Sequence, residues 1–430
     1  MFQKISQALN SELIRHTVML AVSYGSRLVI QAGYFIIIAR ALGIERYGLF
    51  VGLVALANAA LPFATWGSEY ILVKNVARDR TRFSQELGIS ILLSVISGII
   101  LAALCFWIGR ATLPPSTPAL VIVFLLIAEL VGKSIHTQAF KAFIAVNNIS
   151  ASAWLINLVS FKNLVAALIL WVVPIPGDRL VVWTMLYAGS TVLAAVISMG
   201  MAIAQIGKPT FSLANLRTYE YREGFYFSIN QSASSINSNL DKTMLASMAP
   251  LDGAGVYAAA YRIIEISTVP IRALMTAAYS KFFKSGEQGI VGASAFAFKV
   301  LKLSGSYGLF IAILIPFIAP IVPIVLGDEY RDAVQAMRWL APMTILLGLR
   351  FPVADALSSS NYQGIRSLVQ VGTAFINFGV NLVLIPLLSW RGAAIATLIS
   401  DSIQTAVLWG ILLWLLRAQA RLASNDPAQR

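Results

Sequence analysis

Long apolar stretches without charged residues recur along the whole chain. Five windows contain no Lys, Arg, Asp or Glu: Gly88 to Gly109, Ala142 to Phe161, Leu180 to Gly207, Leu303 to Gly327 and Ser367 to Trp390. Each window is long enough for a membrane-spanning helix, which needs about 20 residues. No regular alternation of apolar and polar positions indicates the strands of an outer-membrane barrel. The pattern therefore predicts an all-α polytopic membrane protein.

The same pattern, extended around these windows, predicts about twelve transmembrane helices joined by short connections. They cover residues 17–41, 47–73, 84–109, 118–141, 152–173, 180–206, 225–248, 255–283, 303–327, 333–356, 365–388 and 392–416. Residues 1–16 are polar and mildly amphipathic, without the apolar core and cleavage site of a signal peptide. We therefore expect a cytoplasmic interfacial helix at 1–16.

The two halves of the chain resemble each other weakly. Val172-Val173-Pro174 followed by Arg179 matches Leu384-Ile385-Pro386 followed by Arg391, about half the chain length later. Such a parallel duplication predicts two six-helix bundles related by an axis along the membrane normal. We expect an N-terminal bundle at 17–206, a cytoplasmic linker at 207–224, a C-terminal bundle at 225–416 and a cytoplasmic tail at 417–430.

The composition supports a membrane location. Of the 430 residues, 58% are hydrophobic and 12% are charged, whereas soluble domains have about 25% charged residues. The net charge of +13 could indicate nucleic-acid binding. However, Lys and Arg concentrate in alternate connections, such as Lys74 to Arg82, as they do on the cytoplasmic side of membrane proteins. We expect both termini in the cytoplasm and no nucleic-acid partner.

Residues suited to catalysis or metal binding are scarce. The two histidines, His16 and His136, lie far apart, and Cys105 is the single cysteine. The chain has no Gly-x-x-x-x-Gly-Lys-Ser/Thr motif that would cradle a nucleotide phosphate. We therefore expect no catalytic residues, no metal and no cofactor, and a protein that is not an enzyme.

Basic residues inside the predicted spans carry the main functional signal. A cation at membrane depth costs roughly 2.5–3.5 kcal/mol, so it must face protein or water and usually meets an anionic group. The seven such residues are Arg27, Lys133, Lys162, Lys242, Arg262, Arg272 and Arg350. Three have an acid within reach on their own helix: Lys133 has Glu129, Arg262 has Glu265, and Lys242 adjoins Asp241.

The other cations are candidate ligands for an anion. Arg27, Lys162 and Arg272 have no acid at helical spacing, and Asp355 is poorly spaced to pair with Arg350. Arginine offers a bidentate fork that suits phosphate oxygens. We predict that these four residues bind an anionic group such as a phosphate.

The seventh predicted span is rich in amide and hydroxyl side chains between Ser228 and Asn239. Unmet polar groups in hydrocarbon are costly, so these side chains must face other helices or water. They either join helices by hydrogen bonds or line a hydrated cavity. Amides both donate and accept, which suits sugar hydroxyls. The candidate glycan-binding residues are Asn230, Gln231, Asn237 and Asn239.

Acids inside the spans are candidates for carrying a coupling proton or sodium ion. Glu69, Asp355 and Asp401 are the residues considered. Each of them could instead pair with a cation on another helix, so both interpretations stay open at this point.

Four motifs occur in chain order. They are Ala39-Arg40-Ala41-Leu42-Gly43 with Tyr47-Gly48-Leu49-Phe50; Asp241-Lys242 with Gly253, Gly255, Tyr257, Ala260 and Tyr261; Leu326-Gly327-Asp328-Glu329-Tyr330 with Ala333; and Asn381-Leu382-Val383-Leu384-Ile385-Pro386 with Gly392-Ala393-Ala394-Ile395-Ala396-Thr397. Together they resemble the polysaccharide flippases of the O-antigen transporter type, within the multidrug/oligosaccharidyl-lipid/polysaccharide exporter superfamily. The resemblance implies that cations of the cavity bind a diphosphate of the cargo, a role that Arg27, Lys162, Arg272 and Arg350 suit by placement.

The resemblance implies two six-helix bundles around a central cavity that work by alternating access. It implies a cargo of oligosaccharide joined through diphosphate to a polyprenyl lipid, which moves from the cytoplasmic to the periplasmic leaflet of the bacterial inner membrane. Polysaccharide polymerase and glycosyltransferases are the expected partners, beside membrane lipids. A drug/cation antiporter of the same fold is the main alternative, and a membrane enzyme of glycan assembly is a third.

Overall fold

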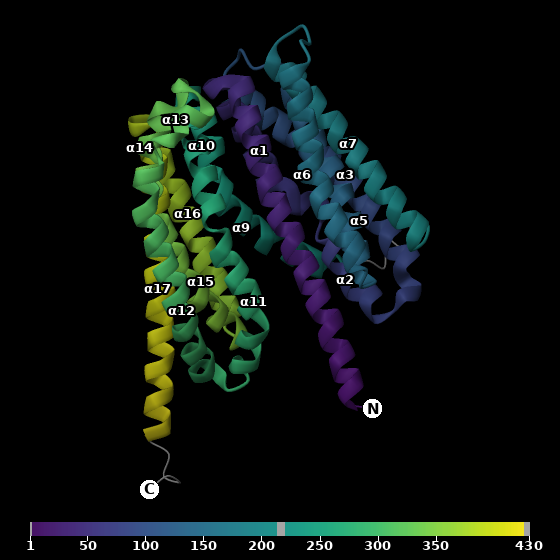
Figure 1. The fold of residues 1–430 in the computed structure, drawn as a ribbon, viewed down its shortest axis with the longest axis vertical. Helices are drawn as coiled ribbons and strands as arrows, with labels where there is room; N and C mark the ends of the chain where they lie inside the picture. Colours follow the sequence, from purple (N-terminus) through teal and green to yellow (C-terminus); the bar gives the residue numbers. More distant parts are fainter. Residues whose placement is uncertain (1, 213–219, 425–430) are drawn as a thin grey trace. The chain divides into compact units, whose positions relative to one another are not determined.

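The chain folds into helices that form two compact units, Met1–Ser235 and Ile236–Arg430. The computed structural model describes the backbone of residues 2–212 and 220–424. Side chains are described from residue 25 onward, except at residues 149, 221, 230, 234, 237, 280, 420 and 422–424. Within the described backbone every regular element is a helix, which confirms the all-α prediction (Figure 1). We call the two parts unit 1 and unit 2.

Unit 1 contains long helices, drawn in purple to teal in Figure 1. They are α1 (Phe2–Thr65), α2 (Ser68–Arg78), the 3-10 turn η1 (Arg80–Arg82), α3 (Phe83–Thr112), α4 (Ala119–Ile127), the π-helical turn η2 (Ala128–Gly132), α5 (Lys133–Ala145), α6 (Ile149–Val172) and α7 (Arg179–Gln205). Helix α9 (Tyr221–Met248) begins in unit 1 and ends in unit 2.

Local chemistry explains where several of these helices begin and end. The Asn148 side chain caps α6 by accepting from the Ala151 N–H, and Asp178 caps α7 by accepting from the N–H groups of Leu180 and Val181. Gly43 interrupts α1 with a φ of 72°, a conformation that glycine adopts at low cost. The first predicted span therefore lies in α1 before this break, and the second runs from α1 after the break into α2.

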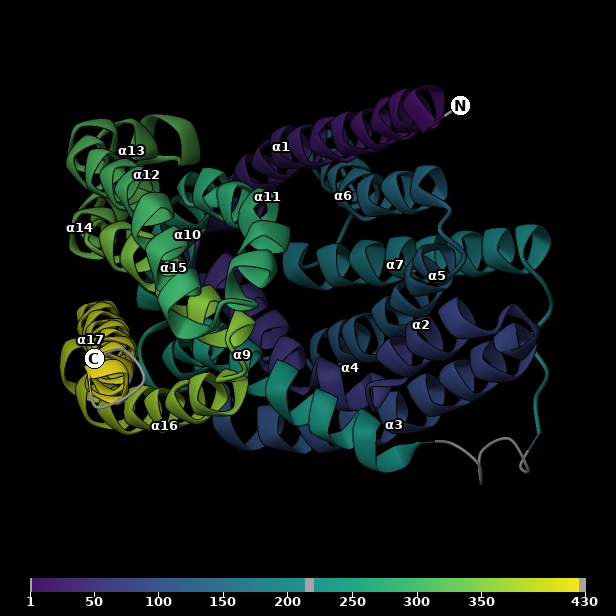
Figure 2. The ribbon, with the colours of Figure 1, turned by 90° about the horizontal axis from the view of Figure 1, so that it is seen from below.

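Unit 2 contains a second set of helices, drawn in green to yellow. They are α10 (Leu251–Ser267), α11 (Val269–Gly286), α12 (Gly289–Ile318), α13 (Ile321–Leu326), the 3-10 turn η3 (Asp328–Tyr330), α14 (Arg331–Leu340), α15 (Met343–Ser359), α16 (Gln363–Leu388) and α17 (Trp390–Ser424). Helices α16 and α17 pack side by side along their length, as Figures 1 and 2 show.

Small residues bring α12 and α15 of unit 2 into close contact. The Ser304 hydroxyl donates to the Gly348 carbonyl at 2.7 Å, and the Thr344 hydroxyl donates to the Gly308 carbonyl at 2.8 Å. A Cβ added at Gly308 would lie 2.5 Å from the Thr344 carbonyl oxygen. Close approach of backbones, combined with hydroxyl hydrogen bonds between helices, is typical of helix pairs in membranes.

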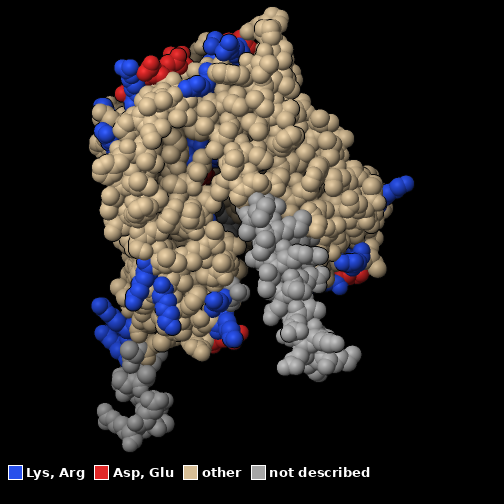
Figure 3. Space-filling view, viewed as in Figure 1, with Lys and Arg blue, Asp and Glu red and all other residues tan. Residues whose placement is uncertain are grey.

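Eight helical segments of the described chain are long and apolar enough to cross a membrane. They are Gly25–Thr65, Arg80–Thr112, Ala119–Ala145, Ser150–Val172, Arg179–Gln205, Gly289–Ile318, Gln363–Leu388 and Trp390–Gln419. The pair Asp328–Leu340 and Met343–Ser359, bent by 42°, would add a ninth. Helix α10, with 17 residues, is short by this measure. The protein is thus a multi-pass membrane protein. On the face of unit 2 shown in Figure 3, the charged side chains gather at the two ends of the unit.

Candidate functional site

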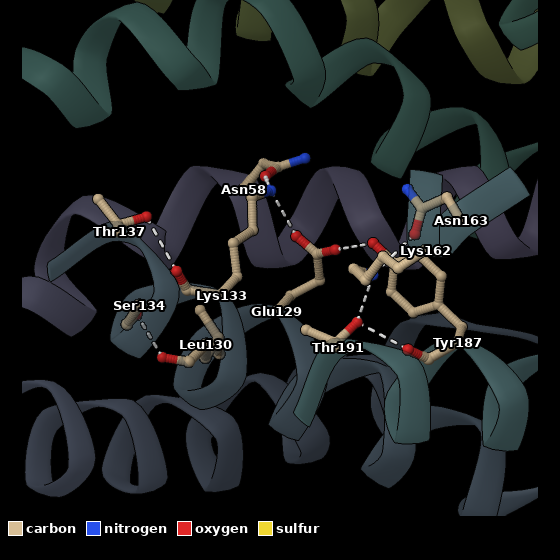
Figure 4. Close-up of polar contacts among 10 residues, drawn as sticks. All are labelled: Asn58, Glu129, Leu130, Lys133, Ser134, Thr137, Lys162, Asn163, Tyr187 and Thr191. Carbon is tan, nitrogen blue, oxygen red and sulfur yellow. Dashed lines mark hydrogen bonds and ion pairs between the residues drawn. The ribbon is translucent and has the colours of Figure 1, made fainter. Parts of the chain in front are cut away.

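A charged hydrogen-bond network lies inside unit 1, within a segment apolar enough to cross a membrane (Figure 4). Glu129 belongs to the π-helical turn η2, and 1% of its side chain is exposed. Its Oε2 accepts from the Lys133 Nζ at 2.7 Å, and its Oε1 accepts from the Tyr187 hydroxyl. The Lys133 Nζ also donates to the Asn58 Oδ1 at 2.8 Å. The Glu129–Lys133 pair predicted from helical spacing is confirmed.

Close packing holds the π-helical turn in place. A Cβ added at Gly98 of α3 would lie 2.7 Å from the Leu130 carbonyl oxygen, and one added at Gly132 would lie 3.1 Å from the Thr191 Cγ2. The backbone of α3 therefore approaches η2 on one side, and the Thr191 side chain of α7 approaches it on another. A π-helical turn inside an α-helix is frequently found at functional sites, and here it carries the buried carboxylate.

Lys162 of α6 approaches the same network without a direct ion pair to Glu129. Its Nζ donates to the Thr191 Oγ1 at 2.6 Å and to the Asn163 Oδ1 at 2.7 Å, and it lies 4.4 Å from the centre of the Tyr187 ring. These partners are neutral, so they hold the ammonium group without cancelling its charge. Lys162 and Glu129 still interact electrostatically. Because two lysines share one carboxylate, the network keeps an excess positive charge.

Arg27 of α1 belongs to the same region of unit 1. Arg27, Lys133 and Lys162 all interact electrostatically with His136. The buried His136 ring is held by its Nδ1, which lies 2.7 Å from the Ser198 hydroxyl. Two of the four predicted diphosphate ligands, Arg27 and Lys162, therefore lie within electrostatic range of His136 in unit 1, on different helices.

The other two predicted ligands lie in unit 2, where their surroundings differ. Arg350 of α15 donates to the Asp401 Oδ1 and the Gln404 Oε1 of α17, both at 2.5 Å. The side chains of Arg350 and Asp401 are 12% and 6% exposed. Asp401 thus neutralises Arg350 within unit 2. Sequence spacing could not reveal this pair because its members lie on separate helices.

Arg272 of α11 keeps its charge available. Its side chain is exposed and makes no hydrogen bond or ion pair with another described side chain. The nearby Glu265 pairs with Arg262 at 2.9 Å and also interacts electrostatically with Lys242 and Arg272. Two carboxylates, Glu265 and Asp241, thus lie near the three cations Lys242, Arg262 and Arg272, and Arg272 is the exposed cation of this cluster.

The polar run of α9 serves two purposes along its length. The buried Ser228 and Ser232 hydroxyls donate to the Pro62 and Ala59 carbonyls of α1, at 2.8 and 3.0 Å. These serines join helices of unit 1. Among the predicted glycan-binding residues, Gln231 is exposed and Asn239 is half-buried, while the side chains of Asn230 and Asn237 lie outside the described residues.

The three acids considered for ion coupling have different environments. Asp355 pairs with Arg366 at 3.1 Å, and Asp401 pairs with Arg350. Glu69 of α2 is buried, and its Oε2 has no hydrogen-bond partner among the described residues. Both cross-helix pairs fit the alternative interpretation of a structural ion pair. Among the three acids, Glu69 keeps an oxygen that no described group satisfies.

Sequence reasoning did not anticipate a second buried carboxylate site, around Asp241. The Asp241 carboxylate accepts from the Tyr257 hydroxyl, which also lies 3.0 Å from the Thr397 hydroxyl. The Lys242 Nζ donates instead to the Ser238 carbonyl and lies 3.8 Å from the Tyr261 ring centre. The motif residues Asp241 of α9, Tyr257 of α10 and Thr397 of α17 thus meet inside unit 2. Their presence in the family motifs was the sequence signal that could have indicated this site.

Several solved structures of membrane transporters share this fold. The fold matches an inward-facing multidrug resistance MATE family transporter of the MOP superfamily, with 17% identity over 96% of this chain and 99% of that chain and a TM-score of 0.71. It matches the lipid II flippase MurJ in an inward closed conformation, with 11% identity over 91% and 86% and a TM-score of 0.72. A MOP superfamily transporter from Pyrococcus furiosus, described as having a binding pocket of reverse polarity, matches with 17% identity over 94% and 96% and a TM-score of 0.61. The chain has the fold of these membrane transporters.

The family follows from the sequence itself. Residues 13–284 match the sequence model of the family described as "Polysaccharide biosynthesis protein". Because this match covers more than half of the chain, the protein belongs to that family. No curated protein sequence matches this one significantly. The family match confirms the family predicted from the motifs, and the fold is shared with solved membrane transporters.

Proposed function

We propose that this protein is a flippase for oligosaccharide joined through diphosphate to a polyprenyl lipid. It moves this cargo from the cytoplasmic to the periplasmic leaflet of the bacterial inner membrane, for the assembly of O-antigen or another surface polysaccharide. The membership in the polysaccharide biosynthesis family and the fold shared with a lipid II flippase support this proposal. The mechanism proposed is alternating access of the two helical bundles, with both termini in the cytoplasm.

The observation that carries the proposal is the positive charge kept within the helices. Lys162 is held by neutral partners, and Arg272 is exposed without an ion-pair partner among the described side chains. A cation in an apolar span costs roughly 2.5–3.5 kcal/mol, so an anionic ligand would offset part of this cost. A diphosphate offers several oxygens to arginine and lysine. We propose that Arg27, Lys162 and Arg272 bind the diphosphate, while Arg350 has a structural role.

The remaining site assignments follow from side-chain chemistry. Gln231 and Asn239, with Asn230 and Asn237 on the same helix, are proposed to bind glycan hydroxyl groups, because an amide can both donate and accept. Glu69 is the acid proposed to bind a coupling proton or sodium ion. The polymerase and glycosyltransferases of the same polysaccharide assembly are the proposed protein partners.

A drug/cation antiporter is the second candidate, and the likeness to a multidrug transporter favours it. That likeness concerns the fold alone. A cationic drug would be repelled by the excess positive charge of the Glu129–Lys133–Lys162 network and by Arg272. The charges of the described residues therefore favour the anionic lipid-linked cargo.

Flipping by the purified protein tests the proposal. In liposomes with a fluorescent prenyl-diphosphate-linked sugar, the wild type is expected to move the lipid across the bilayer, and Arg272→Ala is expected to slow this by about tenfold to a hundredfold. The matched control is Arg331→Ala, which removes an exposed arginine paired with Asp328 at 3.0 Å. Equal rates for empty liposomes and wild type, or for wild type and Arg272→Ala, would contradict the proposal.

A further inference from the structure

The two lysines of the unit 1 network already hold an anion, the Glu129 carboxylate. Glu129 accepts from Lys133 at 2.7 Å and interacts electrostatically with Lys162. A charge-assisted contact of this length is what a phosphate oxygen would make with the same ammonium group. The carboxylate thus occupies the interactions that an anionic cargo would need. Figure 4 shows these side chains together.

The two partners of this ion pair differ in accessibility. The Lys133 side chain is 34% exposed, whereas the Glu129 side chain is 1% exposed. Part of the Lys133 side chain is therefore open to a ligand while the carboxylate stays buried. Lysine carries its charge at the end of a flexible stem with three rotatable donors, so its Nζ can turn from Glu129 toward a ligand without moving the helix.

A separate group stabilises the carboxylate when the lysine turns away. The Tyr187 hydroxyl donates to the Glu129 Oε1, the oxygen that does not contact Lys133. The Lys162 ammonium lies over the Tyr187 ring on the same side of the network. Glu129 therefore keeps the Tyr187 hydrogen bond after the loss of Lys133, which lowers the cost of leaving a charge buried.

We propose that Glu129 is a built-in competitor of the cargo diphosphate. Without cargo, Glu129 holds Lys133 and partly compensates Lys162. When the diphosphate binds, Lys133 leaves Glu129 for a phosphate oxygen, and Tyr187 retains the carboxylate. When the cargo leaves, the ion pair forms again. The competition weakens cargo binding and favours release. This inference rests on the proposed function. Glu129 does not contact the cargo in it; Glu129 is a positioning residue that controls whether Lys133 is available to the diphosphate.

Binding of geranylgeranyl diphosphate to the full-length protein in phosphatidylcholine nanodiscs tests this inference. Glu129→Gln keeps the shape of the side chain and removes its charge, so it is expected to lower the Kd by about tenfold. Tyr187→Phe is expected to raise the Kd by about tenfold, because the freed carboxylate loses its remaining hydrogen bond. A purely structural ion pair would not produce these opposite changes.

A double-mutant cycle of Glu129→Gln and Lys133→Gln measures the coupling between the two residues in the affinity for the diphosphate. In wild type, Lys133→Gln removes a lysine whose charge is already compensated by Glu129. In the Glu129→Gln background, the same substitution removes a lysine whose charge is fully available to the diphosphate. The loss of affinity on Lys133→Gln is therefore expected to be larger in the second background. Glu86→Gln is the matched control, because Glu86 is a buried carboxylate of the same unit held by Asn75 at 2.7 Å.

The outcomes separate the inference from the proposed function. If wild type binds geranylgeraniol as tightly as geranylgeranyl diphosphate, the diphosphate site and this inference both fail. If wild type prefers the diphosphate, but Glu129→Gln and Tyr187→Phe change the Kd no more than Glu86→Gln does, only the inference fails. Opposite shifts in the two variants, with an unchanged control, support it.

Discussion

Replacing Arg350 is expected to destabilise unit 2 because it leaves Asp401 buried without its ion-pair partner. The Asp401 Oδ1 accepts from Arg350, and its Oδ2 has no other partner among the described residues. The Asp401 side chain is 6% exposed, so water cannot readily replace the guanidinium. The perturbation is Arg350→Gln, which removes the charge and keeps an amide near Gln404.

The expected loss in the free energy of unfolding can be derived from the burial of the Arg350–Asp401 ion pair. Removing one partner of a buried ion pair costs about 3–5 kcal/mol, because the remaining charge has no compensation. Replacing both partners by neutral groups is often close to neutral. Arg350→Gln should therefore lower the free energy of unfolding by about 3 kcal/mol or more, and adding Asp401→Asn should recover most of that loss.

The measurement is the unfolding of the single and double variants in detergent micelles, together with flipping in liposomes. Recovery of both stability and flipping in the double variant would establish a structural role for Arg350. Recovery of stability with persistent loss of flipping would instead assign Arg350 to the cargo. If Arg350→Gln is as stable as wild type, the reasoning from burial is refuted.

Three further predictions concern other parts of the chain. Arg27→Ala is expected to slow flipping while the protein still inserts normally into the membrane. Arg27→Lys is expected to flip the lipid faster than Arg27→Ala but more slowly than wild type, because a point charge lacks the guanidinium fork. Wild-type flipping rates in both variants would contradict a role of Arg27 in cargo binding. Gly308→Ala should destabilise unit 2 by about 1–3 kcal/mol because the added methyl group must push α15 away, while Gly364→Ala, which meets open space, should not. Outside the spans, Lys74 lowers the pKa of Glu223, and Glu223 together with Glu220 raises the pKa of Lys74. This ion pair stabilises the start of α9 above the ordinary pKa of glutamate and is lost as pH falls through the lowered pKa, so acid should destabilise wild type more than Glu223→Gln in a thermal unfolding series.

The helical class and the family were predictable because both depend on local sequence. Charge-free windows determine where membrane helices form, and the pair of Glu129 and Lys133 follows from helical spacing. The break at Gly43 falls in the gap predicted between the spans 17–41 and 47–73. The polar α9 also carries a weaker hydropathy signal than the other long helices.

The partners of the site residues could not be predicted, because they depend on packing between helices. Arg350 has no acid well placed on its own helix, yet Asp401 lies beside it on α17. Glu129 was interpreted as the partner of Lys133, but its contact with Tyr187 depends on the approach of α7 to the π-helical turn. A π-helical turn has no reliable sequence signature of its own, so this part of the network required coordinates.

The most direct test of the central claim compares two cargoes in the same flipping experiment. Liposomes containing the purified protein would receive a prenyl lipid carrying one sugar, joined through either a diphosphate or an uncharged linker. We predict that the protein moves the diphosphate lipid at least about tenfold faster, since the cations of the helices bind that group. Equal rates for the two lipids would contradict the claim that these cations recognise a diphosphate.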